Sequence, residues 1–294
     1  MKLSITAKAK LCKPPTAICC CFDKTYIATK GRRVFFTDDM RTFKSILFSS
    51  QVNSLACSEN LLFCCQKNGS VFGINSKHKT AFKTSIGESE CIYSVFDPAA
   101  DNLLVGSKSK KVSIFGLNTI LKSSYFINES PLAYFDVSDS HTLAGISQND
   151  QNIQFVNLKT KEKLSLRIID GFPEILKYLK SDVLIVGSST GVLNCFSTIN
   201  MKRISFLKLG SAITAIHILG STHLLVGTVC FIYLVDLSNF NRMVIAQELP
   251  VDGIPIGFFG TEVIYCAISR ESRLGRWLKC KKGHNQLVVL SIMH

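Results

Sequence analysis

Three short segments of the sequence share one pattern: Val34–Asp38 (VFFTD), Ile153–Asn157 (IQFVN) and Ile232–Asp236 (IYLVD). Each segment begins with Val or Ile and ends in Asp or Asn. The same start recurs along the chain at a nearly constant step, at Val34, Val71, Val112, Ile153, Val192 and Ile232. A step of about 40 residues indicates that one structural unit is repeated.

A second marker keeps the same spacing. Apolar runs such as Leu103–Gly106 and Leu224–Gly227 end in a glycine, and the same step joins Gly106, Gly145, Gly187 and Gly227. Each period divides into four short apolar runs separated by turn residues, which predicts four antiparallel strands. Repeated four-stranded units with this period predict a β-propeller, in which each unit is one blade.

We expect seven blades, of which the last is unusual. Its third strand, Leu287–Ile292, begins clearly more than one period after Ile232, and no fourth strand follows it. The N-terminal segment Leu3–Thr6 is expected to supply that strand and so to close the ring. The sequence predicts one domain over residues 1–294, with the closing strand at 1–8, blades at 16–48, 51–86, 91–127, 131–168, 172–209, 211–249 and 252–294, and a basic insertion at 270–284.

This organisation resembles that of the WD-repeat family over the whole length of the chain. The family's Trp-Asp pair at the end of the third strand has counterparts such as Thr37-Asp38 and Val235-Asp236. The Gly-His pair that precedes the first strand in the family is missing here, since Gly283-His284 lies in the insertion. The resemblance implies an all-β fold, a seven-bladed propeller with four-stranded antiparallel blades. The family's hydrogen-bond network among Asp, His, Ser and Trp is not expected.

Composition limits the class of protein further. Hydrophobic residues make up 47% of the chain and charged residues 19%, so we expect a large core and little disorder. No apolar run reaches the roughly 18–20 residues of a membrane helix, and Met1–Lys8 lacks the apolar stretch of a signal peptide. Twelve cysteines without a C-x-x-C pair indicate buried apolar residues in a reducing compartment rather than a metal site. The predicted location is the cytoplasm or the nucleus.

Basic residues are predicted to gather on one face. The net charge is +13, which favours an acidic partner. In a four-stranded blade, the loop between the second and third strands (the b–c loop) lies on the same face as the connections between blades, and we call this the top face. The b–c loops of blades 7, 1, 2 and 3 carry thirteen basic residues and one acid. We define the basic crescent as Lys8, Lys10, Lys13, Lys30, Arg32, Arg33, Lys67, Lys108, Lys110 and Lys111.

The rest of the top face is expected to be neutral to acidic. The other connections between blades carry Glu88, Glu90, Glu129, Asp170 and Asp252. A crescent of Lys and Arg suits phosphate groups, and binding to phosphates depends strongly on salt. A contact with an acidic protein segment is the alternative.

The insertion at 270–284 is the predicted contact site, because surface insertions add function without disturbing a repeated core. It holds Trp277, the only tryptophan, between basic residues, and Trp and Arg are enriched in binding hot spots. A short helical turn would place Leu274, Trp277 and Leu278 on one face. Alternatively, Trp277 covers the top of blade 7. The predicted partner-binding residues are Arg270, Arg273, Arg276, Trp277, Leu278, Lys279, Lys281 and Lys282.

Nothing in the sequence indicates catalysis. Phosphate-binding glycine motifs are absent, and we expect no cofactor, no metal and no small-molecule substrate. The central channel of the ring is predicted to be mostly apolar, from strands such as Cys19–Cys21, Ala133–Tyr134 and Ala215–Ile216.

Three functions remain open from the sequence. The first is a non-catalytic scaffold that holds protein partners in a larger eukaryotic assembly. The second is an RNA- or ribosome-associated propeller whose crescent contacts the phosphate backbone. The third is an enzyme or a lipid-binding propeller, since Lys30–Arg33 partly resembles the Phe-Arg-Arg-Gly motif of phosphoinositide-binding propellers. The salt dependence of binding separates the first two functions.

Overall fold

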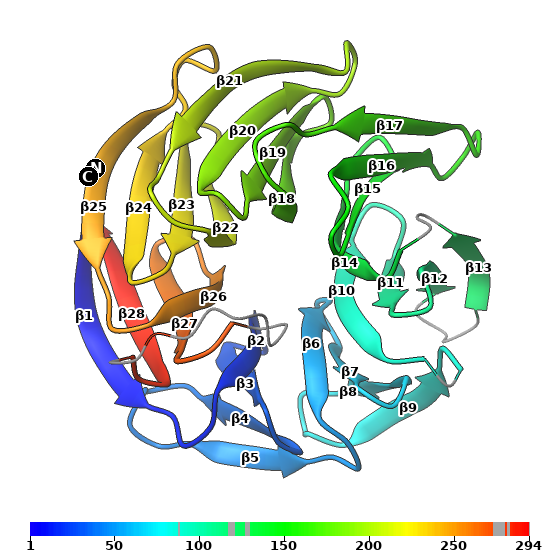
Figure 1. The fold of residues 1–294 in the computed structure, drawn as a ribbon. Helices are drawn as coiled ribbons and strands as arrows, with labels where there is room; N and C mark the ends of the chain where they lie inside the picture. The colour runs from blue at the N-terminus through cyan, green and yellow to red at the C-terminus, as the bar shows by residue number, and fades with distance from the viewer. Residues whose placement is uncertain (88, 117–120, 127–129, 273–279, 281–282, 294) are drawn as a thin grey trace.

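The computed structural model describes residues 1–87, 89–116, 121–126, 130–272, 280 and 283–293. In this part of the chain there are 28 strands and no helix, and the strands form seven four-stranded antiparallel sheets. The sheets stand around a central axis as the blades of a propeller (Figure 1). The predicted all-β, seven-bladed fold is confirmed.

Each blade runs from a strand at the axis, which we call strand a, to a strand d at the rim. Blade 1 is β2 (Pro15–Cys21), β3 (Lys24–Thr29), β4 (Arg33–Thr37) and β5 (Lys44–Leu47), and blade 2 is β6 (Val52–Cys57), β7 (Leu62–Gln66), β8 (Ser70–Ile74) and β9 (Thr80–Ser85). Blade 3 is β10 (Cys91–Asp97), β11 (Asn102–Ser107), β12 (Lys111–Gly116) and β13 (Leu121–Phe126), and blade 4 is β14 (Leu132–Val137), β15 (Thr142–Ser147), β16 (Asn152–Asn157) and β17 (Lys163–Arg167).

The remaining blades follow the same order. Blade 5 is β18 (Pro173–Lys180), β19 (Val183–Ser188), β20 (Val192–Ser197) and β21 (Lys202–Lys208), and blade 6 is β22 (Ile213–Leu219), β23 (His223–Thr228), β24 (Phe231–Asp236) and β25 (Val244–Pro250). Blade 7 is β26 (Ile254–Phe259), β27 (Val263–Ser269), β28 (Gln286–Met293) and, as its outer strand, β1 (Lys2–Lys10).

The two ends of the chain close the ring together. Strand β1 pairs antiparallel with β28, from Lys2 opposite Met293 to Lys10 opposite Gln286. The N-terminal closing strand is therefore confirmed, and it is longer than the Leu3–Thr6 core predicted for it. Lys8 and Lys10 of the basic crescent therefore belong to the end of β1 rather than to a loop. Figure 1 shows both termini together at the rim.

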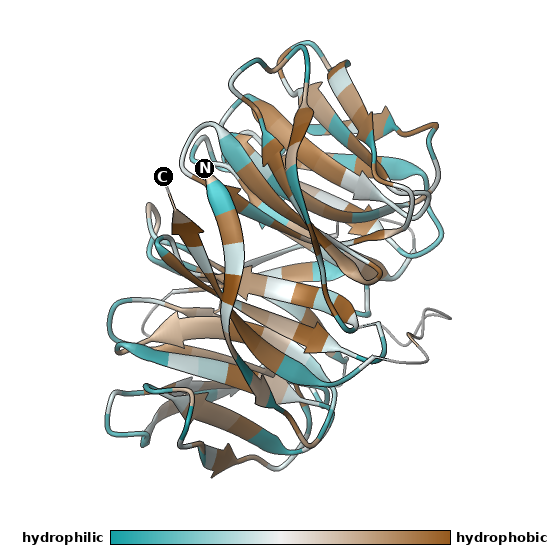
Figure 2. Cartoon of the chain, turned by 90° about the vertical axis from the view of Figure 1, so that its left-hand side faces the viewer, coloured by the Kyte–Doolittle hydropathy of each residue, from teal (hydrophilic) through white to brown (hydrophobic). Residues whose placement is uncertain are grey.

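Burial follows from the position of a strand within its blade. Strands b, such as β7 and β19, are buried along their whole length, because neighbouring blades cover both faces of the sheet. Strands d, such as β9 and β25, alternate between exposed and partly buried residues. In the side view, hydrophobic colours run along the strands and hydrophilic colours gather at the turns (Figure 2).

The repeated glycine of the sequence is explained by close packing between blades. A Cβ atom on Gly106 in β11 would lie 2.6 Å from the ring of Phe135 in the next blade, and one on Gly187 in β19 would lie 2.5 Å from Ile213. Carbon atoms do not approach each other so closely. A side chain at these positions would therefore push adjacent blades apart.

Every strand a has a β-bulge at the same place. The register shifts once near the start of each, and the residue passed over is Thr16, Asn53, Ile92, Ala133, Glu174, Thr214 or Ile256. Three of these side chains donate a hydrogen bond to a carbonyl of the next blade: Thr16 to Val52 (2.8 Å), Asn53 to Cys91 (2.8 Å) and Thr214 to Pro255 (2.6 Å). A β-bulge changes the direction in which the side chain of the bulged residue points. Here the three polar side chains point toward the next blade.

The closing strand gives a test of the fold. Leu3 in β1 is 1% exposed and packs with residues of blades 6 and 7, and its backbone exchanges two hydrogen bonds with the side-chain amide of Gln247 (2.6 and 2.7 Å). We expect Leu3→Ala to lower the free energy of unfolding by about 2–5 kcal/mol, since it leaves a cavity between two blades. Chemical denaturation measures this loss, and Lys2→Ala at the neighbouring exposed position is the control. Equal stability of the two variants would contradict the closure.

Candidate functional site

The axis of the propeller holds a cavity of about 300 Å³. The residue that follows the bulge in each strand a lines it: Ala17, Ser54, Tyr93, Tyr134, Ile175, Ala215 and Gly257. Two residues further on, six of the strands add Cys19, Ala56, Val95, Lys177, His217 and Phe259. Two positions of the repeat therefore supply more than half of the residues that line the cavity.

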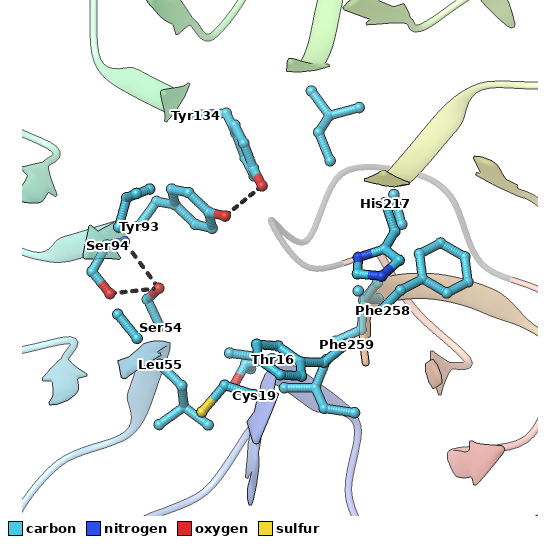
Figure 3. Close-up of a pocket in the computed structure, with 18 of the residues that line it drawn as sticks. Thr16, Cys19, Ser54, Leu55, Tyr93, Ser94, Tyr134, His217, Phe258 and Phe259 are labelled. Atoms are coloured by element: carbon cyan, nitrogen blue, oxygen red, sulfur yellow. Dashed lines mark hydrogen bonds between the residues drawn. The ribbon is translucent and has the colours of Figure 1, made fainter. Parts of the chain in front are cut away.

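Polar groups in the cavity bind to one another. The hydroxyl of Tyr134 donates to that of Tyr93 at 2.5 Å, and the Ser94 hydroxyl donates to Ser54 at 2.9 Å (Figure 3). His217 donates from Nε2 to the carbonyl of Gly260 at 2.6 Å. Burial lowers the pKa of His217, and the charge of Lys177 lowers it further. The imidazole is therefore neutral at pH 7.

A buried ion pair stands beside the tyrosines. The Lys177 ammonium lies 3.3 Å from Asp136 Oδ1, while Asp136 Oδ2 accepts a hydrogen bond from the backbone N–H of Tyr178 at 2.9 Å. Burial lowers the pKa of Lys177, but attraction and a hydrogen bond to the Asp136 carboxylate, together with the neighbouring Tyr93 and Tyr134, outweigh it, so the pKa lies well above its ordinary value. The pair joins blades 4 and 5, and it leaves Lys177 with its counter-ion already in place.

Most of the residues that line the cavity are apolar, as expected, but blades 3 to 6 also present Tyr93, Tyr134, Lys177 and His217 to it. The sequence contained a signal for them, since Tyr93 and Tyr134 are one repeat step apart, as are Lys177 and His217. Each strand contributes only one or two of them, so no local motif marks the channel. Among the described residues, no group of three or more His, Cys, Asp or Glu side chains is arranged to hold a metal ion.

Hydrogen bonds fix the b–c loops that carry several residues of the predicted basic crescent. In five successive blades the first residue of the b–c loop donates its backbone N–H to the connection before the same blade. The pairs are Lys30–Pro14, Lys67–Gln51, Lys108–Glu90, Gln148–Pro131 and Ser189–Phe172, at 2.7–2.9 Å. These bonds hold the loops and the connections together on the top face. Within the crescent, Arg33 and Lys111 begin strands β4 and β12 rather than lying in loops.

Carboxylates neutralise part of the crescent. Glu90 lies between two lysines, 3.5 Å from Lys67 and 3.7 Å from Lys108. Two further pairs join Lys8 to Asp252 (3.7 Å) and Lys30 to Glu271 (2.8 Å). Glu90 and Asp252 therefore lie within the basic region and not opposite to it, so the top face is less sharply divided than the sequence indicated.

The predicted contact insertion is described only at its ends. Arg270 is exposed, its N–H binds Asn285 Oδ1 at 2.9 Å, and its carbonyl accepts a hydrogen bond from the N–H of Cys280 at 3.0 Å. The other predicted partner-binding residues lie outside the described residues: Arg273, Arg276, Trp277, Leu278, Lys279, Lys281 and Lys282.

Comparisons with known proteins identify the fold. No family model matches the sequence, and no curated protein matches it either. Among solved structures, U3-55K and the RRP9 WD40 repeats each superpose with a TM-score of 0.88 at 12% identity, covering 99% of this chain and 98% and 97% of theirs. A chain of the mitotic checkpoint complex superposes with a TM-score of 0.84 at 11% identity, covering 99% of this chain and 92% of that one.

These similarities define the chain as a seven-bladed β-propeller of the kind found in WD40 repeat structures. The resemblance predicted from the repeat period is confirmed at the level of the fold. The low identity agrees with the missing signature residues. No helix in the described part of the chain is long and apolar enough to span a membrane.

The neutralising role of Glu90 can be measured. We expect Glu90→Gln to strengthen binding to heparin by roughly two- to fivefold at low salt, since a surface ion pair is worth about 1 kcal/mol or less. Glu59→Gln, an exposed site in the turn between β6 and β7, makes the same change in net charge on the opposite face. Equal retention of the two variants on a heparin column would show that Glu90 does not screen the crescent.

Two cysteines that the sequence analysis left apart lie together on the top face. Their Sγ atoms, from Cys230 in the b–c loop of blade 6 and Cys280 in the insertion of blade 7, are 3.2 Å apart. We expect diamide to oxidise the pair to a disulfide, diamide taking up the two electrons and two protons. Burial raises the pKa of Cys230 to about 11, so the rate should increase from pH 7 to 10 as the thiolate forms.

Peptide mapping without reduction detects the disulfide. Cys230→Ser should abolish it, and Cys12→Ser, at an exposed cysteine, should leave it unchanged. A disulfide between Cys280 and any other cysteine would contradict this placement.

Proposed function

We propose that this protein is a non-catalytic scaffold that holds protein partners within a larger eukaryotic assembly, in the cytoplasm or the nucleus. The observation that carries the proposal is the connection between β27 and β28. It runs from Arg270 to Asn285 and is several times longer than the b–c loops of the other six blades, such as Lys30–Arg32 in blade 1. The repeated core needs no such extension, so the added residues are free to serve recognition.

The partner-binding residues of this scaffold are proposed to be Arg270, Arg273, Arg276, Trp277, Leu278, Lys279, Lys281 and Lys282. Two further observations support a binding role. First, polar groups of the central channel interact with one another, since Lys177 forms an ion pair with Asp136 and Tyr134 donates a hydrogen bond to Tyr93. Second, one structural neighbour is a chain of a structure named as the mitotic checkpoint complex.

A second candidate function is contact with RNA, in a ribosome-associated or similar particle. The basic crescent and the net charge of +13 favour it. The ion pairs of Lys8, Lys30, Lys67 and Lys108 count against it, because each must be opened or shared before the lysine reaches a phosphate. Binding to phosphates would also weaken steeply as salt increases.

Affinity purification of the native complex, with and without nuclease, tests the first function against the second. We expect a fixed set of proteins to remain bound after nuclease treatment and at raised salt. Loss of the partners with nuclease would replace the scaffold by the RNA-contacting propeller.

The insertion is tested in the same purification by the variant Arg273→Glu/Arg276→Glu/Lys281→Glu/Lys282→Glu, which should lose the partners. The matched control reverses four exposed lysines on the opposite face, Lys77, Lys79, Lys159 and Lys202, which lie in or beside the turns between third and fourth strands. Retention of all partners by the insertion variant would remove the insertion from the proposal.

A further inference from the structure

A crevice lies between blade 1 and the β1–β2 connection that leads into this blade. Its volume is about 520 Å³, which is within the range of ligand pockets. The β1–β2 connection contributes Lys13, the β3–β4 turn contributes Gly31 and Arg32, and strands β4 and β5 contribute Arg33, Phe35 and Leu47. The crevice is therefore built by blade 1 together with the connection that leads into it.

The walls of the crevice are held by backbone hydrogen bonds. The N–H of Lys30 donates to the carbonyl of Pro14 at 2.7 Å, and the N–H of Phe48 donates to that of Arg32 at 2.7 Å. Lys13 lies directly over Gly31, since a Cβ atom on this glycine would be 3.2 Å from Lys13 Cδ and 3.3 Å from its Nζ. The connection, the turn and the outer strand therefore form one fixed unit.

The charges of the crevice differ from those of the four crescent lysines that form ion pairs. Lys13, Arg32 and Arg33 are exposed, and no carboxylate of the described residues lies within ion-pairing distance of them. Arg33 Nη1 instead donates to the Ser45 hydroxyl at 2.9 Å, which holds the guanidinium above β5. The crevice is therefore a concentration of positive charge without a counter-ion from the described chain.

Apolar side chains lie beside these charges. In the antiparallel pair of β4 and β5, Arg33 is opposite Leu47 and Phe35 is opposite Ser45, so these four residues share one face of blade 1. Leu47 is 60% exposed, although it is a large hydrophobic residue. A ligand that fits this crevice must offer negative charge and an apolar group together.

We propose that the crevice binds an extended acidic segment of a partner protein, with its carboxylates on Lys13, Arg32 and Arg33 and an aliphatic side chain against Phe35 and Leu47. Arginine and carboxylate groups form charge-assisted, often bidentate hydrogen bonds. The exposed Leu47 favours a peptide over RNA, because a base stacks on an aromatic ring, and Phe35 is half-buried. The proposal rests on the scaffold function and names the chemistry of one partner.

Selection of phage-displayed random 12-residue peptides on the purified protein tests the proposal. We expect the selected peptides to be acidic with at least one aliphatic residue. Fluorescence anisotropy should show that Lys13→Glu/Arg32→Glu weakens their binding at least about tenfold, because hydrogen bonds between charged groups are lost. Leu47→Ser should weaken it roughly fivefold through lost apolar burial. Lys67→Glu, within the crescent but outside the crevice, is the matched control and should have little effect.

Three results would overturn the proposal: no selected peptide, a selected set without acidic residues, or equal binding by the wild-type protein and Lys13→Glu/Arg32→Glu. A 12-nucleotide oligouridine that binds more tightly than the peptides, and depends on the same two residues, would make the crevice an RNA site and would also overturn it. Purification of the native complex with Lys13→Glu/Arg32→Glu separates the two proposals. If the full partner set remains, the scaffold stands and the crevice has no part in it.

Discussion

The structure depends on the antiparallel pairing of β1 with β28. Each blade has two apolar faces, so it is stable only when a neighbour covers each of them. A ring meets this requirement for all seven blades at once, whereas an open row leaves two faces and two sheet edges exposed to water. Pairing the two ends of the chain in one sheet therefore stabilises every blade, including those far from the closure, and the buried Leu3 lies at that junction.

Much of the fold could be predicted from the sequence because the packing repeats. Gly187 and its equivalents recur since each blade approaches the next in the same way, and the period survives although the family's signature residues do not. Other groups now join the blades, for example Thr16 with Val52 and Asp136 with Tyr178. The hydrogen-bond network of the signature residues is thus one solution among several for linking adjacent blades.

The top face could be predicted less well than the fold. A count of basic residues per loop located the crescent, but it could not show which lysines have counter-ions. Those counter-ions come from other blades or other loops, as when Glu90 lies between Lys67 and Lys108. The crevice was missed for a similar reason, since a count of charges per loop does not show that Lys13 and Leu47 line one pocket in the folded chain. Which basic residues are available to a partner therefore depends on which of them form ion pairs in the folded structure.

Closure through β1 also sets the timing of folding during synthesis. Lys2 pairs with Met293, so β1 has no partner until the residues up to β28 have been made. At about 5–20 residues per second this interval lasts roughly 15–60 s. Meanwhile β1 is an unpaired strand, and the blades already made present an uncovered apolar face. The nascent propeller is thus most prone to aggregation just before β28 is made, when the exposed apolar surface is large and the strand that would complete the ring is still unpaired.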